Sequence, residues 1–174
     1  MDKIKNQILK EVLPAEKDVA PPVVSAHAKG KKPALHLDHW TSAVLLERAA
    51  YLHKLARQGD GSAGETLKEY PQHCAMLSFR SRDGEAEVHE NFADVFYVLE
   101  GRATLVTGGT VTGARLIKPG ETRGDSIQGG IESVARQELR AGDVAHVPAG
   151  LPHQMLVAGE QTVTCLVMKV QENP

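Results

Sequence analysis

The order of apolar and polar residues along the chain changes its period near residue 73. Before that point, four apolar residues recur at the spacing of one face of an α-helix: Leu45, Ala49, Leu52 and Ala56. Thr41 or Ser42 can cap the first turn of this helix, and Gly59 can end its last turn. The pattern therefore predicts one helix between Thr41 and Gly59.

From His73 onward, apolar and polar residues alternate, as they do in β-strands that bury one face. The alternating segments are HCAMLSFRS, EAEVHE, DVFYVLE, RATLVT, ARLIK, VARQELR, DVAHVP, PHQMLV and TVTCLVMKV. Glycine, proline or polar residues separate most of them, and no helical pattern interrupts the series. Nine short strands of this kind predict an all-β antiparallel barrel or sandwich and not a βαβ sheet.

Three other segments lack a clear period of apolar residues. Residues 1–38 mix charged, small and proline residues and predict an extended arm that wraps its own barrel or a neighbour's. The arm holds a lysine cluster that we interpret as solvated: Lys29, Lys31 and Lys32. Residues 59–64 (GDGSAG) favour a loop, and residues 65–70 favour a short helical turn. We therefore expect the arm and helix to occupy residues 1–72 and the barrel domain residues 73–174.

A glycine-rich stretch lies between Thr107 and Glu132. A segment of this length inside a small β domain is typically a functional or a flexible loop. Glycine loops that bind phosphate lead into a helix, and no helical pattern follows here, so a nucleotide-binding loop is excluded.

Composition and charge exclude some classes of protein. The 174 residues are 41% hydrophobic and 24% charged, which is typical of a soluble globular domain. A net charge of -2 and a pI near 6.4 give no basic surface for nucleic acid. Because no apolar run approaches the roughly 18 residues that span a bilayer, we expect a cytoplasmic protein without a membrane anchor, unless a leader has been removed. Cys74 and Cys165 both lie in expected strands and are interpreted as buried free thiols.

Four possible metal ligands occur in two of the expected strand regions. Glu87 and His89 are two residues apart, so an extended strand directs both side chains to the same face. Asp94 follows after a short turn, and His153 follows a segment rich in glycine and proline. These four residues could direct two oxygen and two nitrogen ligands toward one point.

The two regions resemble the paired motifs of the cupin superfamily. The first motif has the order His, any residue, His, an acid and Gly, and the corresponding residues here are Glu87, His89, Asp94 and Gly101. The second motif has the order Gly, Pro, Gly, His and Asn, and the corresponding residues here are Gly142, Pro148, Gly150, His153 and Val157. The resemblance covers roughly residues 77–170 and implies a double-stranded β-helix, the jelly-roll barrel of this family.

The chain departs from the family's ligand pattern at two positions. Glu87 stands where the pattern has its first histidine, and Asp94 stands where it has glutamate. Two carboxylates and two imidazoles suit one divalent ion of Zn, Mn or Fe better than copper. An alternative register uses His89 and Asn91 as the first two ligands but leaves only two residues before Asp94. The alternative without metal is a hydrogen-bonded polar plug at the barrel mouth.

Neighbouring residues suggest further roles. His146, on the strand that leads to His153, is a candidate catalytic acid or base beside the ion. Phe96 and Val98 share strand parity with Asp94 and are expected to line the barrel interior. Arg123 could hold an anionic substrate from the glycine-rich stretch, although a solvated arginine is the simpler interpretation.

The resemblance implies a metal-dependent enzyme that acts on a small oxygenated organic molecule. Dioxygenase, isomerase, lyase and decarboxylase chemistries are all compatible with it, because a fold does not select a reaction. The alternatives are a non-catalytic module that binds or senses a small molecule and a structural barrel whose site is vestigial. A homodimer is the expected assembly, because the arm lacks a core of its own and the strands leave a flat β surface.

Overall fold

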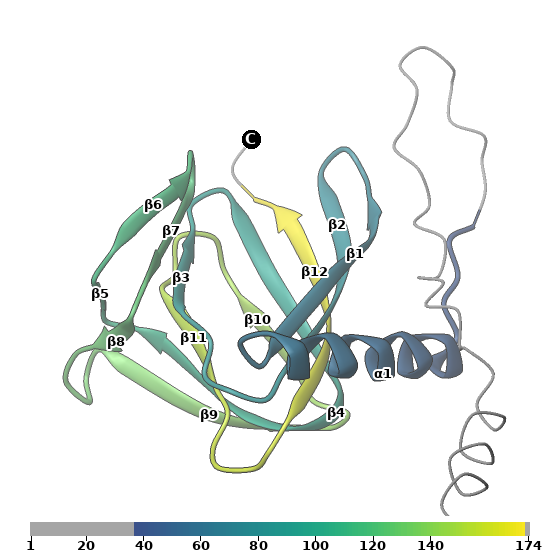
Figure 1. Cartoon of the computed structure of the whole chain (residues 1–174). Helices are drawn as coiled ribbons and strands as arrows, with labels where there is room; N and C mark the ends of the chain where they lie inside the picture. The colour runs from purple at the N-terminus through teal and green to yellow at the C-terminus, as the bar shows by residue number, and fades with distance from the viewer. Residues whose placement is uncertain (1–36, 173–174) are drawn as a thin grey trace, which may run out of the picture. The chain divides into compact units, whose positions relative to one another are not determined.

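The computed structural model describes residues 37–172, which form one helix followed by twelve strands (Figure 1). The elements are α1 Ser42–Gln58, β1 Ser62–Glu69, β2 His73–Arg80, β3 Ala86–His89, β4 Phe92–Gly108, β5 Thr110–Thr112, β6 Arg115–Lys118, β7 Glu121–Gly124, β8 Ser126–Gln128, β9 Val134–Arg140, β10 Val144–Val147, β11 His153–Leu156 and β12 Val163–Gln171. The three lysines and nearly all of the expected arm lie outside the described residues. The division at residue 72 therefore stays a prediction.

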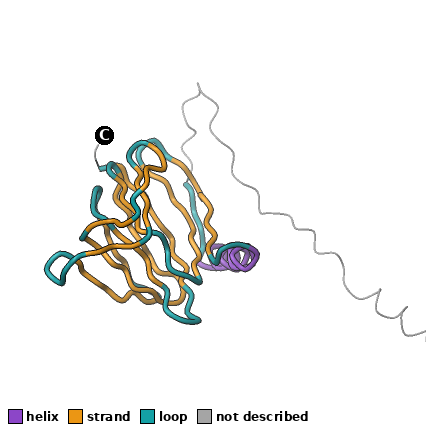
Figure 2. Tube along the Cα trace, turned by 60° about the vertical axis from the view of Figure 1, so that its left-hand side comes forward, coloured by secondary structure: helices purple, strands orange, loops and turns teal. Residues whose placement is uncertain are grey.

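Helix α1 confirms the expectation from apolar spacing. The Thr41 hydroxyl accepts a hydrogen bond from the Val44 amide, and the helix ends at Gln58, before Gly59. The four apolar residues at helical spacing are all buried: Leu45, Ala49, Leu52 and Ala56. They pack on residues of β1 and β2 and form an apolar cluster with Leu67, Ala75, Leu77 and Phe79, against which Trp40 also packs. Figure 2 views this helix nearly end-on, beside the strands.

The expectation for residues 59–70 was wrong, because Ser62–Glu69 is strand β1 and not a loop with a helical turn. The strand pairs antiparallel with β2, from Ser62 opposite Arg80 to Glu69 opposite Cys74. Only Leu67 in this strand is buried, so the segment carries almost no local apolar pattern. Its pairing partner and the helix beside it determine its conformation.

Strand β4 joins two segments that the sequence pattern separates. Gly101 lies within it at a φ of 79°, and a Cβ at this position would collide with the Thr162 carbonyl oxygen. Glycine is therefore required where the strand bends. The first half of β4 pairs with β10 and β12, and the second half pairs with β9 and β11.

The sheet curls around a central apolar cluster. Its strand order is β1-β2-β12-β4-β11-β3-β7-β6, with β9 and β10 also paired to β4. Figure 1 shows β3 and β11 facing β12 and the first half of β4 across the interior. This arrangement is the expected double-stranded β-helix. The interior cluster includes Val98, Leu105, Val147 and Val167.

The glycine-rich stretch is not the expected loop, and the strand expected within it at ARLIK is confirmed as β6. It contains the four strands β5 to β8, of which β5 pairs with β8 and β6 pairs with β7. Strand β7 also pairs with β3, so His89 lies opposite Glu121. The stretch therefore supplies one wall of the barrel beside the candidate ligands.

Two smaller expectations are also resolved by the structure. Cys165 is a buried free thiol as expected, whereas the free thiol of Cys74 is only half-buried. Among the described residues, no helix has the length and apolar character needed to cross a membrane.

Candidate metal centre

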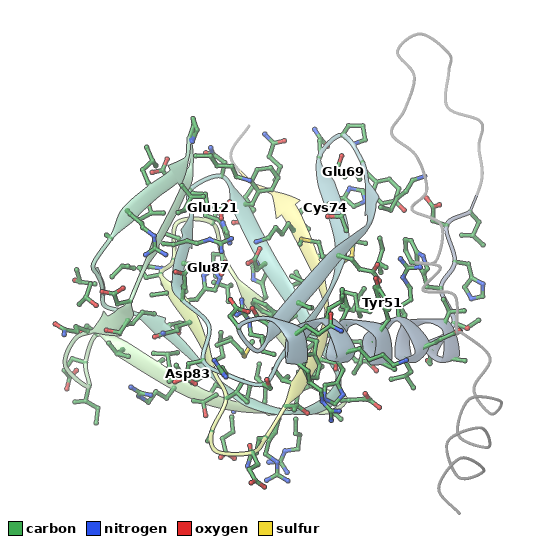
Figure 3. The ribbon with its side chains drawn as sticks, in the orientation of Figure 1. Tyr51, Glu69, Cys74, Asp83, Glu87 and Glu121 are labelled. Carbon is green, nitrogen blue, oxygen red and sulfur yellow. The ribbon has the colours of Figure 1, made fainter. Side chains whose placement is uncertain are left out.

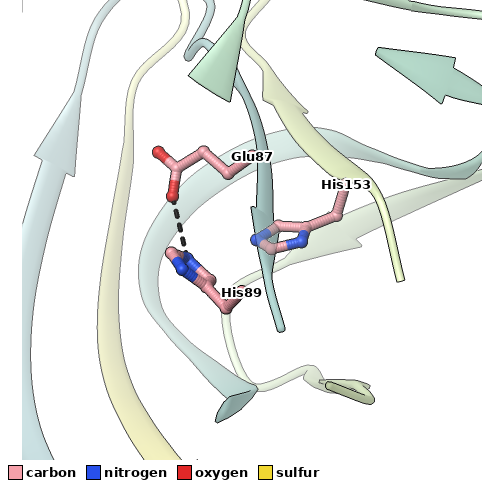
Figure 4. A group of neighbouring side chains, drawn as sticks. All are labelled: Glu87, His89 and His153. Carbon is pink, nitrogen blue, oxygen red and sulfur yellow. Dashed lines mark hydrogen bonds and ion pairs between the residues drawn. The ribbon is translucent and has the colours of Figure 1, made fainter. Parts of the chain in front are cut away.

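Three strands position the four candidate ligands. Glu87 and His89 lie on β3 and point to one face, as strand alternation predicts. His153 begins β11 and is paired directly with Glu87 in the antiparallel register of β11 and β3. Asp94 is near the start of β4. The Glu87 carboxylate lies next to the His89 ring, and the His153 ring approaches them from β11 (Figure 4).

The structure brings all four side chains together. One potential ligand atom from each of Glu87, His89 and His153 lies within 4.8 Å of the others. Asp94 Oδ2 is 3.4 Å from His89 Nε2 and 3.3 Å from His153 Nε2. His89 Nε2 is also 3.1 Å from Glu87 Oε2. The four residues named as possible ligands in the sequence therefore lie close together in the structure.

The hydrogen bond of His153 determines which ring nitrogen faces the cluster. Its Nδ1 lies 3.1 Å from the Leu151 carbonyl oxygen, which can only accept, so Nδ1 carries the proton and donates. Nε2 then faces the cluster, 3.3 Å from Asp94 Oδ2, where a proton on Nε2 or a metal ion can bridge the two atoms. An imidazole whose Nδ1 is held by a backbone carbonyl presents Nε2 in the orientation of a metal ligand.

Sequence reasoning missed Lys169, which lies in the middle of the cluster. Its Nζ donates hydrogen bonds to Asp94 Oδ1 and Oδ2 at 2.8 and 2.9 Å and lies 2.8 Å from His89 Nε2. The register of β12 and β4 pairs Lys169 directly with Asp94. A signal was present in the sequence, because Lys169 has the same strand parity as three buried residues: Val163, Cys165 and Val167.

The pKa values of three side chains show which groups of the cluster are charged at neutral pH. Burial by itself would raise the pKa of Glu87, but the hydrogen bond with His89 and the charge of Arg123 lower it to about 2. Burial would lower the pKa of His89, but hydrogen bonds with Asp94 and Glu87 raise it to about 9. Burial opposes the ionisation of Asp94, yet hydrogen bonds with His153 and His89 and the charge of Lys169 hold its pKa far below the usual range. Both carboxylates are therefore ionised at neutral pH.

A carboxylate and arginine pair, Glu121 and Arg123, lies beside the cluster. Glu121 on β7 is buried, and it accepts a hydrogen bond of 2.9 Å from Arg123 Nε and forms a 3.1 Å ion pair with Lys118. Arg123 is also 3.5 Å from Glu85. Glu87 and Glu121 lie on neighbouring strands (Figure 3). Arg123 is therefore ion-paired, and 37% of its side chain is exposed.

A cavity of about 230 Å³ opens beside the cluster. Asp94, His153 and Lys169 contribute to its polar lining. Its apolar lining includes Met76, Phe96, Val163 and Val167, and its charged lining includes Arg80, Glu85 and Arg123. Phe96 lies edge-on to His153 with the ring centroids 6.2 Å apart, as expected for a residue that lines the interior. Val98 is fully buried in the core.

The structure does not bring His146 into the cluster. Its side chain is 54% exposed on β10 and lies 3.4 Å from Glu172, while Val147 next to it faces the core. Asn91, the ligand in the alternative register, is also exposed, whereas Glu87 lies in the cluster. The placement of the side chains favours the register that uses Glu87 and His89.

The donor set fits a divalent cation. Ligand atoms of Glu87, His89 and His153 lie within 4.8 Å of one another, and Asp94 Oδ2 lies 3.4 and 3.3 Å from Nε2 of the two histidines. Oxygen and nitrogen ligands of this kind suit Zn, Mn or Fe. Lys169 supplies one positive charge at the same place, so part of the negative charge is balanced within the chain.

Comparisons with known proteins give a family match and several structural likenesses. A family model described as Cupin matches residues 84–174. Similar solved structures include the protein TT1209 from Thermus thermophilus, at 19% identity and a TM-score of 0.49, covering 72% of this chain and 93% of that chain. The polyketide cyclase RemF from Streptomyces resistomycificus aligns at 20% identity and a TM-score of 0.45, covering 66% and 68%. The DMSP lyase DddQ from Ruegeria pomeroyi aligns at 16% identity and a TM-score of 0.46, covering 65% and 48%. No curated protein matches the chain.

Proposed function

Since this chain belongs to the cupin family, we propose that it is a metal-dependent enzyme whose ion is held by Glu87, His89, Asp94 and His153. The observation that carries the proposal is the convergence of these four buried or half-buried side chains beside a cavity. Such a site would hold one Zn, Mn or Fe ion per chain.

The surroundings of the site support a small oxygenated organic molecule as substrate. The cavity of about 230 Å³ lies below the usual range for ligand pockets and therefore suits a small ligand. Met76 and Phe96 would exclude water from one side of the substrate, and Arg80 and Arg123 could orient an anionic oxygen. When bound, the ion would polarise a carbonyl or carboxylate oxygen of the substrate. The reaction class is one of dioxygenase, isomerase, lyase or decarboxylase.

A second candidate function is a non-catalytic module that binds or senses a small molecule. The specific observation in its favour is Lys169, which already places a positive charge between Asp94 and His89. In this case the cavity would bind a ligand, and the ion would orient the ligand or be absent.

Metal analysis and a turnover screen separate these candidates. The protein is purified without chelator, reconstituted with Fe(II), Mn(II) or Zn(II), and measured for bound metal. The loaded protein is then screened against small acids, enols and sugars. The enzyme proposal expects close to one ion per chain and turnover of one compound class. Tight binding without product would favour the module, and well under one ion per chain after reconstitution would overturn the metal site.

We also propose a homodimer. Tyr97 and Val144 are paired residues on neighbouring strands, and both are exposed apolar side chains on the outer surface of the barrel. Sedimentation at micromolar protein concentration is expected to give the mass of two chains. A monomer would contradict this assembly.

A further inference from the structure

Lys169 contacts two of the four proposed metal ligands. Its ammonium has three close contacts, and all three are with atoms of two proposed metal ligands, His89 and Asp94. Its side chain is 23% exposed, so the charge is largely withdrawn from water. A partly buried ammonium of this kind is costly unless its charge is balanced, and here Asp94 balances it.

The contacts of Lys169 exclude a metal ion at the same atoms. Lys169 Nζ lies 2.8 Å from His89 Nε2 and 2.8 and 2.9 Å from the two carboxylate oxygens of Asp94, so the ammonium occupies the space in front of the atoms that would bind a metal. A metal ion binds an imidazole nitrogen at about 2.0–2.1 Å, closer than the ammonium now lies. Two cations so close together in a buried site repel each other strongly. The ammonium therefore has to leave before an ion can take both His89 and Asp94.

Space for that movement exists on both sides of the cluster. Lys169 lines the cavity of about 230 Å³ described above and also a second cavity of about 350 Å³. The second cavity is lined by His89, Cys74 and Glu69 among others. A lysine side chain has a flexible stem of four carbons and can move its charge into either space without a change in the backbone.

We propose that Lys169 is a tethered cation that competes with the metal ion for His89 and Asp94 and so sets the metal affinity of the site. This inference rests on the proposed metal centre. In the absence of metal, Lys169 stabilises the barrel by balancing Asp94. When metal binds, part of the binding free energy is spent on displacing the ammonium, so the native site binds metal more weakly than its four ligands alone would.

The experiment compares metal affinity in three variants by calorimetric titration of Zn(II) and Mn(II) at one fixed neutral pH. Lys169→Met keeps the apolar length of the side chain and removes the charge. Lys169→Arg keeps the charge. Lys54→Met removes a charge from an exposed side chain of α1 that lines neither cavity and is the matched control. We expect Lys169→Met to bind metal about tenfold more tightly or more, and the other two variants to stay within about threefold of the native protein.

Thermal unfolding provides a second measurement that does not depend on activity. Without metal, Lys169→Met is expected to unfold at a lower temperature than the native protein, because Asp94 loses its counter-ion. Saturating metal should raise its unfolding temperature by more than it raises that of the native protein. If Lys169→Met folds only in the presence of metal, Lys169→Gln replaces it, and the requirement for metal itself supports the competition.

The outcomes distinguish this inference from the proposed metal centre. Native protein that binds one ion, with equal or weaker affinity in Lys169→Met, would overturn the competition and leave the metal centre standing. A failure of both the native protein and Lys169→Met to bind metal would overturn the metal centre and the inference with it.

Discussion

Leu52 and Asp94 are equally buried, with 2% of each residue exposed, but they belong to two regions held together by different forces. Leu52 lies in the apolar cluster between α1 and strands β1 and β2. Asp94 lies in the charged cluster between β3, β4, β11 and β12, where it contacts two histidines and one lysine. An apolar side chain is stabilised by any neighbour of suitable shape, whereas a buried carboxylate needs particular partners.

The two regions also differ in how much stability they lose when a side chain is changed. Loss of a methyl group in the apolar cluster leaves a cavity, and the cost is limited by the area and volume removed. Loss of one charge in the polar cluster leaves the opposite charge buried and unpaired. The apolar region therefore loses stability in proportion to the atoms removed, whereas the charged region depends on both partners of each pair being present.

The largest expected effect is on the charged cluster. Asp94→Asn keeps the shape of the side chain but leaves Lys169 without its counter-ion, so we expect the metal-free protein to lose about 3–5 kcal/mol of unfolding free energy. Urea unfolding followed by circular dichroism measures this loss. The double variant Asp94→Asn with Lys169→Met should recover part of it, because neither charge is then buried alone. A loss below about 1 kcal/mol in the single variant would contradict the pairing.

The apolar cluster gives the next effect. Leu52→Ala is expected to cost about 2–5 kcal/mol of unfolding free energy and to leave metal affinity unchanged. Leu46→Ala on the exposed side of the same helix is the control, with an expected cost of less than about 1 kcal/mol. Weaker metal binding in Leu52→Ala would show that the two regions are coupled and would remove the contrast between them.

A smaller effect is expected when one ligand is removed. His153→Ala should weaken metal binding about a hundredfold, or about 2.7 kcal/mol, because one of four donors is lost. His146→Ala is the matched control, since His146 is exposed and pairs with Glu172 outside the cluster. Calorimetric titration of both variants tests this prediction. Equal affinity in His153→Ala and the native protein would exclude His153 as a ligand.

The smallest expected effect is on the labelling of the two thiols by a reagent. Each thiol lines one of the two cavities, so its labelling shows whether that cavity is open to solvent. Cys165 is buried in the lining of the smaller cavity, and burial raises its pKa to about 12. Cys74 is half-buried in the lining of the larger cavity. We expect a thiol reagent to label Cys74 slowly in the native protein and Cys165 only after denaturation. Mass spectrometry identifies the labelled residue, and rapid labelling of Cys165 would show that the smaller cavity opens.

The helix and the ligand cluster could be predicted from the sequence because both depend on short spacings. The interval between Leu45 and Ala56 defines a helical face, and the interval between Glu87 and His89 defines a strand face. His153 lies far from them in the chain, and its place in the cluster was implied by the resemblance to a family with paired motifs.

Other parts could not be predicted because their conformation depends on distant partners. Strand β1 has only one buried residue, and its ladder with β2 makes it a strand. The glycine-rich stretch has little apolar alternation, yet β7 pairs with β3 and forms a wall beside His89. In both segments the hydrogen bonds of the backbone to another strand replace the missing local pattern.

The sequence by itself determined which residue types were available and which of them share a face within one helix or strand. It therefore identified Glu87, His89, Asp94 and His153 as a possible set. Only the tertiary structure decided which group balances the charge of these residues. Lys169 and Asp94 are 75 positions apart in the chain and meet because β12 pairs with β4. Sheet register sets that contact, and a buried charge depends on its nearest partner more than on its neighbours in the chain.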